Sequence, residues 1–390
     1  MRRWLNRNVV GIGLADLAAD ANYEMVFAVL PLFITTGLGA PAFAVGVIEG
    51  VGDGSSAVIR LLSGWYSDRI SWRKPVAVGG YATTVLGLGA LVAVTAWPQV
   101  VIARAFAWMG RGLRQPIRSA MLAGSVEKAD LGKAFGFHEA LDTAGALIGP
   151  AIAFLLLSTG GGFRSIFWTA LLPGVLCVAL FAAITRDPRQ GASAPIPLRV
   201  PLPSDFWRLM VPVAIFGVGN FATAFFTLRA AQLMQPELSQ TAAVAAAVGF
   251  YLAHNAVGAA VSFPAGWLAD MFGKKPILAA AYVSFSLACV VAFLGHGWVA
   301  LGLMALFVGA QNPVVSAIEG SLTSSIVEER RLGTAFGILS GINGAADLAS
   351  SVAAGVLWTF ASPLVALGFG GVLSFLAAVI LWLKGPRPSN

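Results

Sequence analysis

Twelve long apolar runs follow one another along this chain, separated by short polar segments, and they limit the folds open to it. An α-helix needs about 20 mainly apolar residues to cross the hydrocarbon core of a bilayer. Each run meets that length, so we expect an all-α polytopic membrane protein with twelve transmembrane helices. The expected spans are residues 9–35, 42–66, 74–96, 99–124, 132–157, 164–185, 209–234, 242–269, 275–295, 298–324, 333–359 and 362–383.

Charged residues are too few to cover the surface of a soluble protein of this size. They make up 11% of the 390 residues, and hydrophobic residues make up 57%. Soluble domains carry about 25% charged residues. The sequence also has no phosphate-binding Walker loop, no Ser/His/Asp nucleophile set and three histidines in all. We therefore expect neither an enzyme nor a nucleic-acid binder, and no cofactor or bound metal.

The positions of the basic residues predict the orientation of the chain. Twelve spans put both termini on one side of the membrane, and every loop lysine and arginine lies on that side except Arg164. Because basic loops stay in the cytoplasm, we expect a multi-pass protein of the inner cell membrane with both termini cytoplasmic. The net charge of +7 largely reflects this bias.

A Pro-rich polar segment, residues 186–208, separates six spans from six. We expect a cytoplasmic linker there, between an N-terminal six-helix bundle at 1–185 and a C-terminal one at 209–390. The halves are related in sequence: Gly64-Trp-Tyr-Ser-Asp68 returns 202 residues later as Gly266-Trp-Leu-Ala-Asp270. A fifth-span string, Leu-Gly-Lys-Ala-Phe-Gly, returns 201 residues later with one change. We infer a duplicated six-helix unit, a plan that recurs in transporters around a central binding site.

The repeated loop resembles the signature loop of the major facilitator superfamily. The matching residues of the two copies are Gly64, Asp68, Arg69, Arg73 and Lys74, then Gly266, Asp270, Lys274 and Lys275. Ser71 and Met271 depart from the pattern. The resemblance implies a monomeric transporter that works by alternating access. We expect each loop to gate the cytoplasmic side, because its Asp can accept hydrogen bonds from the start of the next helix.

The fifth span carries a second, narrower resemblance, to bacterial drug–proton antiporters. Gly136, Gly145, Gly149 and Pro150 have the spacing of that group's motif, while Ala153 and Phe154 replace its closing glycines. The resemblance implies antiport. Small residues at this spacing also let helices pack closely, which is the alternative explanation.

Ionisable residues inside the spans are costly, and by default they indicate function. Asp16, Asp20 and Glu24 repeat every four residues and form one row on the first span, here called the acidic row. A buried carboxylate that alternates between wet and dry surroundings binds and releases a proton. Our proton-coupling candidates are Asp20 and Asp53 first, then Glu24, Glu139 and Asp142. Their expected charge partners, or anion-binding groups, are Arg60, Arg104, Arg111, Arg114 and Arg229. The alternative for most of these residues is a structural salt bridge.

The second half is less charged, so we expect it to shape the substrate site. Asn220 aligns with Asp16, so the second copy of the repeat has a neutral polar residue where the first copy has an acid. We expect His254 to be a hydrogen-bonded interior residue. The candidates for the substrate cavity are Asn220, Phe225, His254, Asn255, Gln311, Asn312 and Asn343.

The sequence favours a transporter that exports a small organic molecule and is driven by a proton gradient. Two alternatives stay open: an uptake symporter or exchanger for an organic anion, and a lipid-handling or receptor protein on the same fold. Arginines paired with the acids would favour the exporter. Free guanidinium groups would favour the anion carrier.

Overall fold

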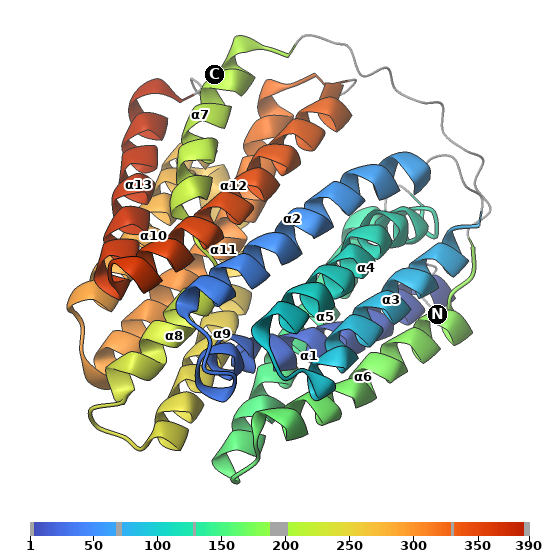
Figure 1. Ribbon diagram of the computed structural model, residues 1–390. Helices are drawn as coiled ribbons and strands as arrows, with labels where there is room; N and C mark the ends of the chain where they lie inside the picture. Colours follow the sequence, from blue (N-terminus) through green and yellow to red (C-terminus); the bar gives the residue numbers. More distant parts are fainter. Residues whose placement is uncertain (1–3, 68–71, 128–129, 188–201, 329–330, 386–390) are drawn as a thin grey trace. The chain divides into compact units, whose positions relative to one another are not determined.

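The computed structural model describes residues 4–67, 72–127, 130–187, 202–328 and 331–385 of this protein (Figure 1). The described part of the first half contains six α-helices, each coinciding with an expected span. Their bounds are α1 (Arg7–Leu32), α2 (Ala42–Ser67), α3 (Arg73–Ala90), α4 (Trp97–Ala123), α5 (Leu131–Ser158) and α6 (Phe163–Ile184). A π-helical turn, Phe33–Gly37, extends α1, and a 3-10 turn, Leu91–Ala93, extends α3.

The second half has the same succession with one difference. Its described helices are α7 (Ser204–Gly219), α8 (Thr223–Met234), α9 (Gln240–Phe272), α10 (Lys274–Leu294), α11 (Gly297–Ile326), α12 (Leu332–Phe360) and α13 (Pro363–Lys384). We expected the seventh span as one helix over 209–234, and this is wrong on two points. The helix begins earlier, at Ser204, inside the expected linker, and it is interrupted between Gly219 and Thr223.

The interruption of the seventh span has a local explanation at Asn220. Its backbone leaves the helical region, with φ −84° and ψ 75°, and a helix that ends there leaves carbonyl groups without intrahelical donors. The Ser350 hydroxyl on α12 donates to the Asn220 carbonyl at 3.2 Å. A side chain of another helix therefore partly replaces the hydrogen bonds that the break removes.

Ten of the described segments are long and apolar enough to cross a membrane, judged by length and composition. Two further long helices, α4 and α12, coincide with expected spans but are more polar. Four arginines lie on α4, and α12 carries Asn343 and Asp347 among small residues. The protein is thus an all-α polytopic membrane protein, and one of the two more polar helices, α4, carries a row of arginines.

The chain divides into two compact units. The first contains residues 1–33 and 51–196, and the second contains 34–50 and 197–390. In the first unit α1 packs against α5 and α6, and α3 packs against α4 (Figure 1). In the second unit α11 packs against α9 and α10, and α13 packs against α7 and α10. The end of the first span and the start of the second belong to the second unit, where the Phe43 amide donates to Thr359 Oγ1.

Two glycines of α5 set the spacing between α5 and α1. A Cβ added to Gly145 would lie 2.4 Å from the Leu17 carbonyl oxygen, and one added to Gly149 would lie 2.6 Å from that of Ala21. Such distances are well below van der Waals contact, so these positions require glycine. The third glycine of the motif, Gly136, has no neighbour within 4 Å of such a Cβ. Close packing thus brings the acidic row of α1 directly against α5.

Candidate functional site

The carboxylate of Asp16 lies at the centre of a buried polar network in the first unit, with none of its surface exposed. Arg118 Nη1 on α4 lies 2.7 Å from Asp16 Oδ1. The Tyr81 hydroxyl on α3 donates to the same oxygen at 2.5 Å. His138 Nε2 on α5 lies 2.6 Å from Oδ2. One carboxylate therefore joins four helices, and both of its oxygens are bonded.

One helical turn further along α1, Asp20 lies next to a second carboxyl. Asp20 is 2% exposed, and Asp142 on α5 is its hydrogen-bonding neighbour. Within the described residues Asp20 Oδ2 has no hydrogen-bond partner. Arg111 on α4 acts electrostatically on Asp20, and its Nη2 donates to the Tyr23 hydroxyl at 3.3 Å. The pair thus differs from Asp16, which has an arginine in direct contact.

The arginines of α4 are held largely by aromatic rings. The Arg104 guanidinium lies 3.8 Å from the ring centre of Phe27 and 3.6 Å from that of Trp108. Arg111 lies 4.6 Å from the ring centre of Tyr23. A ring face attracts a cation and supplies part of the stabilisation that water would otherwise give.

Arg114 is held in the same way, 4.2 Å from the ring centre of Tyr81. It is 2% exposed, and within the described chain its Nη1 is buried without a hydrogen-bond partner. Arg118, the last arginine of α4, forms a direct ion pair with Asp16 of the acidic row.

The remaining first-half candidates lie in different surroundings. Asp53 on α2 is half-buried and accepts a hydrogen bond from Trp108 Nε1 at 2.9 Å. Glu24 is half-buried, whereas Glu139 and Arg60 are exposed. An α-helix turns by about 100° per residue, so Glu139 is rotated away from the face on which its neighbour His138 meets Asp16. The structure therefore brings Asp20 and Asp142 together and leaves Glu139 apart.

The polar candidates of the second unit are spread over four helices. His254 is 6% exposed and bonds through Nδ1 to the Tyr251 carbonyl at 2.5 Å, which confirms an interior hydrogen-bonded histidine. Gln311 is 1% exposed, and its Nε2 has no partner in the part of the chain that the structure describes. Asn255 is half-buried and Asn312 is exposed. Arg229 donates from Nε to the Ala292 carbonyl at 2.8 Å.

Phe225 belongs to an aromatic core of the second unit. It is fully buried, and its ring centre lies 5.7 Å from that of Phe221 and 5.5 Å from that of Trp358. Phe221 directly follows Asn220 at the interruption of the seventh span. The aromatic rings therefore hold the chain around the break rather than lining an open space at Phe225.

Glu319 is a buried acid that was not among our site candidates. It lies on α11, is 2% exposed, and accepts hydrogen bonds from the Tyr282 hydroxyl and from Asn343 Nδ2, both at 2.9 Å. The internal repeat could have found it. At the repeat offset of 201 residues, Tyr81 corresponds to Tyr282, Arg118 to Glu319, and Asp142 to Asn343.

The expected gating loops are only partly described. Asp68 and Arg69 lie outside the described residues. Gly64 lies on α2, and Gly266 and Asp270 lie on α9, but the structure does not describe their side-chain environment. At the start of α3 the Lys74 amide donates to Asp187 Oδ1 at 2.7 Å, so a residue three positions beyond the end of α6 caps this helix.

Other basic residues of the two loops lie partly inside the protein. Arg73 is 9% exposed, and Lys275 is half-buried. At the start of α10, Lys274 Nζ donates to the Ser321 carbonyl at 3.0 Å. Each loop thus contributes a contact to a neighbouring element of its own unit.

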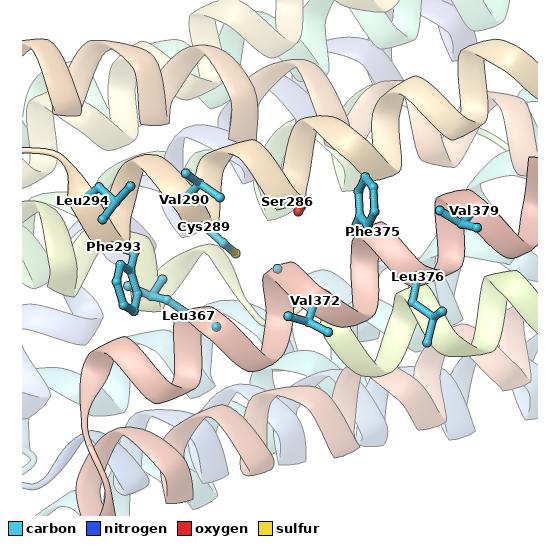
Figure 2. Close-up of a pocket in the computed structure, with 12 residues that line it drawn as sticks. Ser286, Cys289, Val290, Phe293, Leu294, Leu367, Val372, Phe375, Leu376 and Val379 are labelled. Carbon is cyan, nitrogen blue, oxygen red and sulfur yellow. The ribbon is translucent and has the colours of Figure 1, made fainter.

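An open groove of about 680 Å³ lies between α10 and α13 of the second unit (Figure 2), and several of its lining side chains, such as Phe293 and Phe375, are exposed. Phe293, Leu367, Val372 and Phe375 line it, together with Ser286 of α10. It contains none of the residues assigned above to substrate or proton binding. Its walls offer hydrocarbon contact and almost no hydrogen bonding.

One group of side chains in the described part has the spacing of metal ligands. Asp16, His138 and Asp142 each place a ligand atom within 4.8 Å of the others. The Arg118 guanidinium lies against Asp16, and it already supplies positive charge to that carboxylate. We therefore describe this group as a hydrogen-bonded network, without assigning a metal.

Comparison with solved structures identifies the fold. The nucleoside transporter NupG superposes with a TM-score of 0.79 at 13% identity, covering 96% of this chain and 98% of that chain. A D-xylose–proton symporter gives a TM-score of 0.71 at 15% identity, covering 97% and 98%. Identities this low show a shared fold and no shared substrate.

Sequence comparison extends this likeness to the family. An uncharacterised MFS-type transporter of Methanocaldococcus jannaschii is 28% identical over 383 residues, which cover 97% of this chain and 95% of that protein. The family described as the Major Facilitator Superfamily matches residues 12–253 and again residues 215–390, in keeping with the duplicated halves. The chain therefore belongs to the Major Facilitator Superfamily of membrane transporters.

Proposed function

We propose that this protein exports a small organic molecule across the inner membrane in exchange for protons, by alternating access. In this proposal one chain is the transport unit and both termini are cytoplasmic. The observation that carries it is the contact between Asp20 and Asp142, beside Arg111 and inside the first unit. The fifth-span glycines, which resemble those of drug–proton antiporters, support antiport and also create this contact.

The Asp20–Asp142 pair is suited to holding one exchangeable proton. Two carboxylates in contact repel each other, and the repulsion is relieved when the pair takes up a proton. Burial of Asp20 strengthens the effect because little water screens its charge, while Asp142 is half-buried. Arg111 opposes it, so a shift of α4 relative to α1 and α5 changes how readily the pair keeps its proton. Conformation and protonation are thereby linked.

Asp16 has a different part in this proposal. Its two oxygens are bonded to Arg118, Tyr81 and His138, and the Arg118 guanidinium balances its charge. Because these partners stabilise the carboxylate form of Asp16, we expect it to stay ionised and not to take up a proton during transport. We assign Asp16 to holding α1 against α3, α4 and α5, which positions Asp20 for the exchange.

The substrate is assigned to the second unit, near the interruption of the seventh span. Discontinuous helices frequently form the binding sites of transporters, because their broken ends present backbone polar groups at membrane depth. Asn220 lies at this break, and Gln311 offers a buried amide nitrogen without a partner in the described chain. These groups favour a substrate that has hydrogen-bonding groups.

A carrier of organic anions is the second candidate, and it depends on the arginines. Arg118 is paired with an acid, Arg104 and Arg111 are stacked on rings, and Arg229 is bonded to a backbone carbonyl. Arg114, whose Nη1 has no hydrogen-bond partner in the described chain, is the observation that favours an anion. We favour the exporter because most of the arginines are occupied.

The test is a substrate screen in proteoliposomes with an imposed pH gradient. We expect the wild-type protein to accumulate its substrate against the gradient of that substrate. Asp20→Asn and Asp142→Asn should each abolish accumulation driven by the pH gradient, while exchange of labelled for unlabelled substrate persists. Asp205→Asn, at an exposed ion pair with Arg208, is the matched control and should transport normally. Unchanged coupling in both variants would refute proton exchange at this pair.

A further inference from the structure

The carboxyl of Glu319 lies inside the second unit with neutral partners only. Its Oε1 accepts from the Tyr282 hydroxyl and its Oε2 from Asn343 Nδ2, each at 2.9 Å. The side chain is 2% exposed. Within the described residues no cationic group forms an ion pair with it. A buried charge of this kind lacks the compensation that buried charges normally require.

The two helices that bond Glu319 carry three described charged residues, Lys274 and Lys275 at the start of α10 and Asp347 one turn beyond Asn343 on α12. Tyr282 comes from α10 and Asn343 from α12. Lys275 is half-buried, and Lys274 Nζ donates to the Ser321 carbonyl. None of these contacts places a positive charge on the carboxyl.

The other neighbouring helices of α11 have their charged groups engaged elsewhere. His254 on α9 bonds to the Tyr251 carbonyl of its own helix, close to Gly309 and well before Glu319 along α11. Arg229 on α8 donates to the Ala292 carbonyl, and the acid and base at the start of α7 pair with each other. The side chain of Asp270 lies outside the described residues.

The corresponding place in the first unit is built differently. There the tyrosine at the equivalent position, Tyr81, donates to the carboxylate of Asp16, and Arg118 balances its charge. In the second unit the position equivalent to Arg118 is Glu319 itself. In both halves the tyrosine donates to a carboxyl group. In the second half that carboxyl belongs to Glu319, which occupies the position of the cation Arg118.

We infer that Glu319, with Tyr282 and Asn343, forms a second proton-binding site, in the C-terminal half. A proton from water binds to one carboxylate oxygen and makes the buried side chain neutral. When the site becomes hydrated, the same proton returns to water and the two hydrogen-bond donors stabilise the carboxylate. This inference goes beyond the proposed exchange at Asp20 and Asp142, because it locates proton binding in a different unit and on different residues.

The experiment is an infrared pH titration of the purified protein in proteoliposomes, with protons as the only ligand. A protonated carboxyl absorbs as a carboxylic acid, and its C=O band is replaced by carboxylate bands when it ionises. We expect the wild-type protein to show a carboxylic-acid band that persists to higher pH than exposed glutamates allow. Glu319→Gln should remove the part of this absorption that comes from Glu319 and leave the contribution of the Asp20–Asp142 pair. Glu237→Gln, an exposed acid between α8 and α9, should leave it unchanged.

Two further variants keep the result interpretable. Tyr282→Phe removes one hydrogen bond and retains the acid, so we expect the band to remain and to shift in frequency. Asp20→Asn changes the first-unit pair and should leave the Glu319 band in place. A titration in which Glu319→Gln removes no such band would overturn the inference. Loss of coupling in Asp20→Asn is measured by transport, so the two proposals can fail separately.

Discussion

The two halves of this transporter place a tyrosine at equivalent positions and give it different neighbours. Tyr81 belongs to a network in which Asp16 carries its charge against Arg118, while Tyr282 bonds to an acid without a described cation. The two halves therefore share a tyrosine that donates to a buried carboxyl group, and they differ in whether an arginine balances the charge of that carboxyl. The difference separates a charge that holds helices together from a carboxyl that can exchange a proton.

The physical basis of the difference is the cost of burying charge. An ion pair that is fully bonded recovers much of the energy lost when its members leave water, whereas a single buried charge does not. The first half keeps its pair by supplying Tyr81 and His138 as further partners. In the second half Asn343 and Tyr282 supply hydrogen bonds without charge.

The largest expected effect comes from removing one member of the first-half ion pair. Arg118→Met should lower the free energy of unfolding by about 3–5 kcal/mol, because it leaves Asp16 buried and uncompensated. Glu319→Gln should cost far less, since it leaves no charge unpaired and an amide can keep hydrogen bonds. Chemical denaturation in mild detergent measures both. Equal losses would contradict the distinction between the halves, and Asp16→Asn combined with Arg118→Met should recover part of the loss.

A smaller effect is expected at the contact between α1 and α5. Gly145→Ala should lower the free energy of unfolding by about 1–3 kcal/mol through overpacking, because its Cβ would meet the Leu17 carbonyl. Ala346 occupies the equivalent position of the second half, so the substitution makes the first half resemble the second. Gly136→Ala, which meets no neighbour, is the control. Thermal unfolding should separate the two variants, and similar melting temperatures would show that α5 can move away from α1.

The smallest effect compares the two tyrosines directly. A hydrogen bond to a charged group contributes about 1.5–3 kcal/mol, and one between neutral groups about 0.5–1.5 kcal/mol. We therefore expect Tyr81→Phe to destabilise the protein by about 1 kcal/mol more than Tyr282→Phe. Parallel denaturation curves of the two variants check this. A larger loss for Tyr282→Phe would indicate that Glu319 is charged in the folded protein.

The sequence predicted the membrane spans well because each is a long apolar run that can be read locally. It failed at the seventh span, where a break over residues 220–222 lies inside an otherwise apolar run. Hydropathy averages over a whole helix and does not detect where the backbone leaves it. The Ser350 hydroxyl that meets this break comes from a helix far along the chain, and its proximity depends on packing.

The site was predictable where spacing along one helix carries the information. The four-residue repeat of Asp16 and Asp20 placed both on one face of α1, and that face is buried against α5. Which partner each acid takes depends on neighbouring helices, so the contacts with His138 and Tyr81 could not be read from spacing. Glu319 could have been found from the sequence, since the repeat offset alone aligns it with Arg118 of the first half.

The break at Asn220 also bears on how substrate recognition can be mapped by mutation. The last carbonyls of α7 and the first amides of α8 belong to the backbone, so almost every side-chain replacement leaves them in place. If these groups bind the substrate, alanine variants along the segment would keep nearly the same affinity for it. Proline at Thr223 or Ala224 would remove an amide donor and keep the side chains of α7 intact. Backbone chemistry, rather than side-chain identity, would then carry the specificity at the centre of this span.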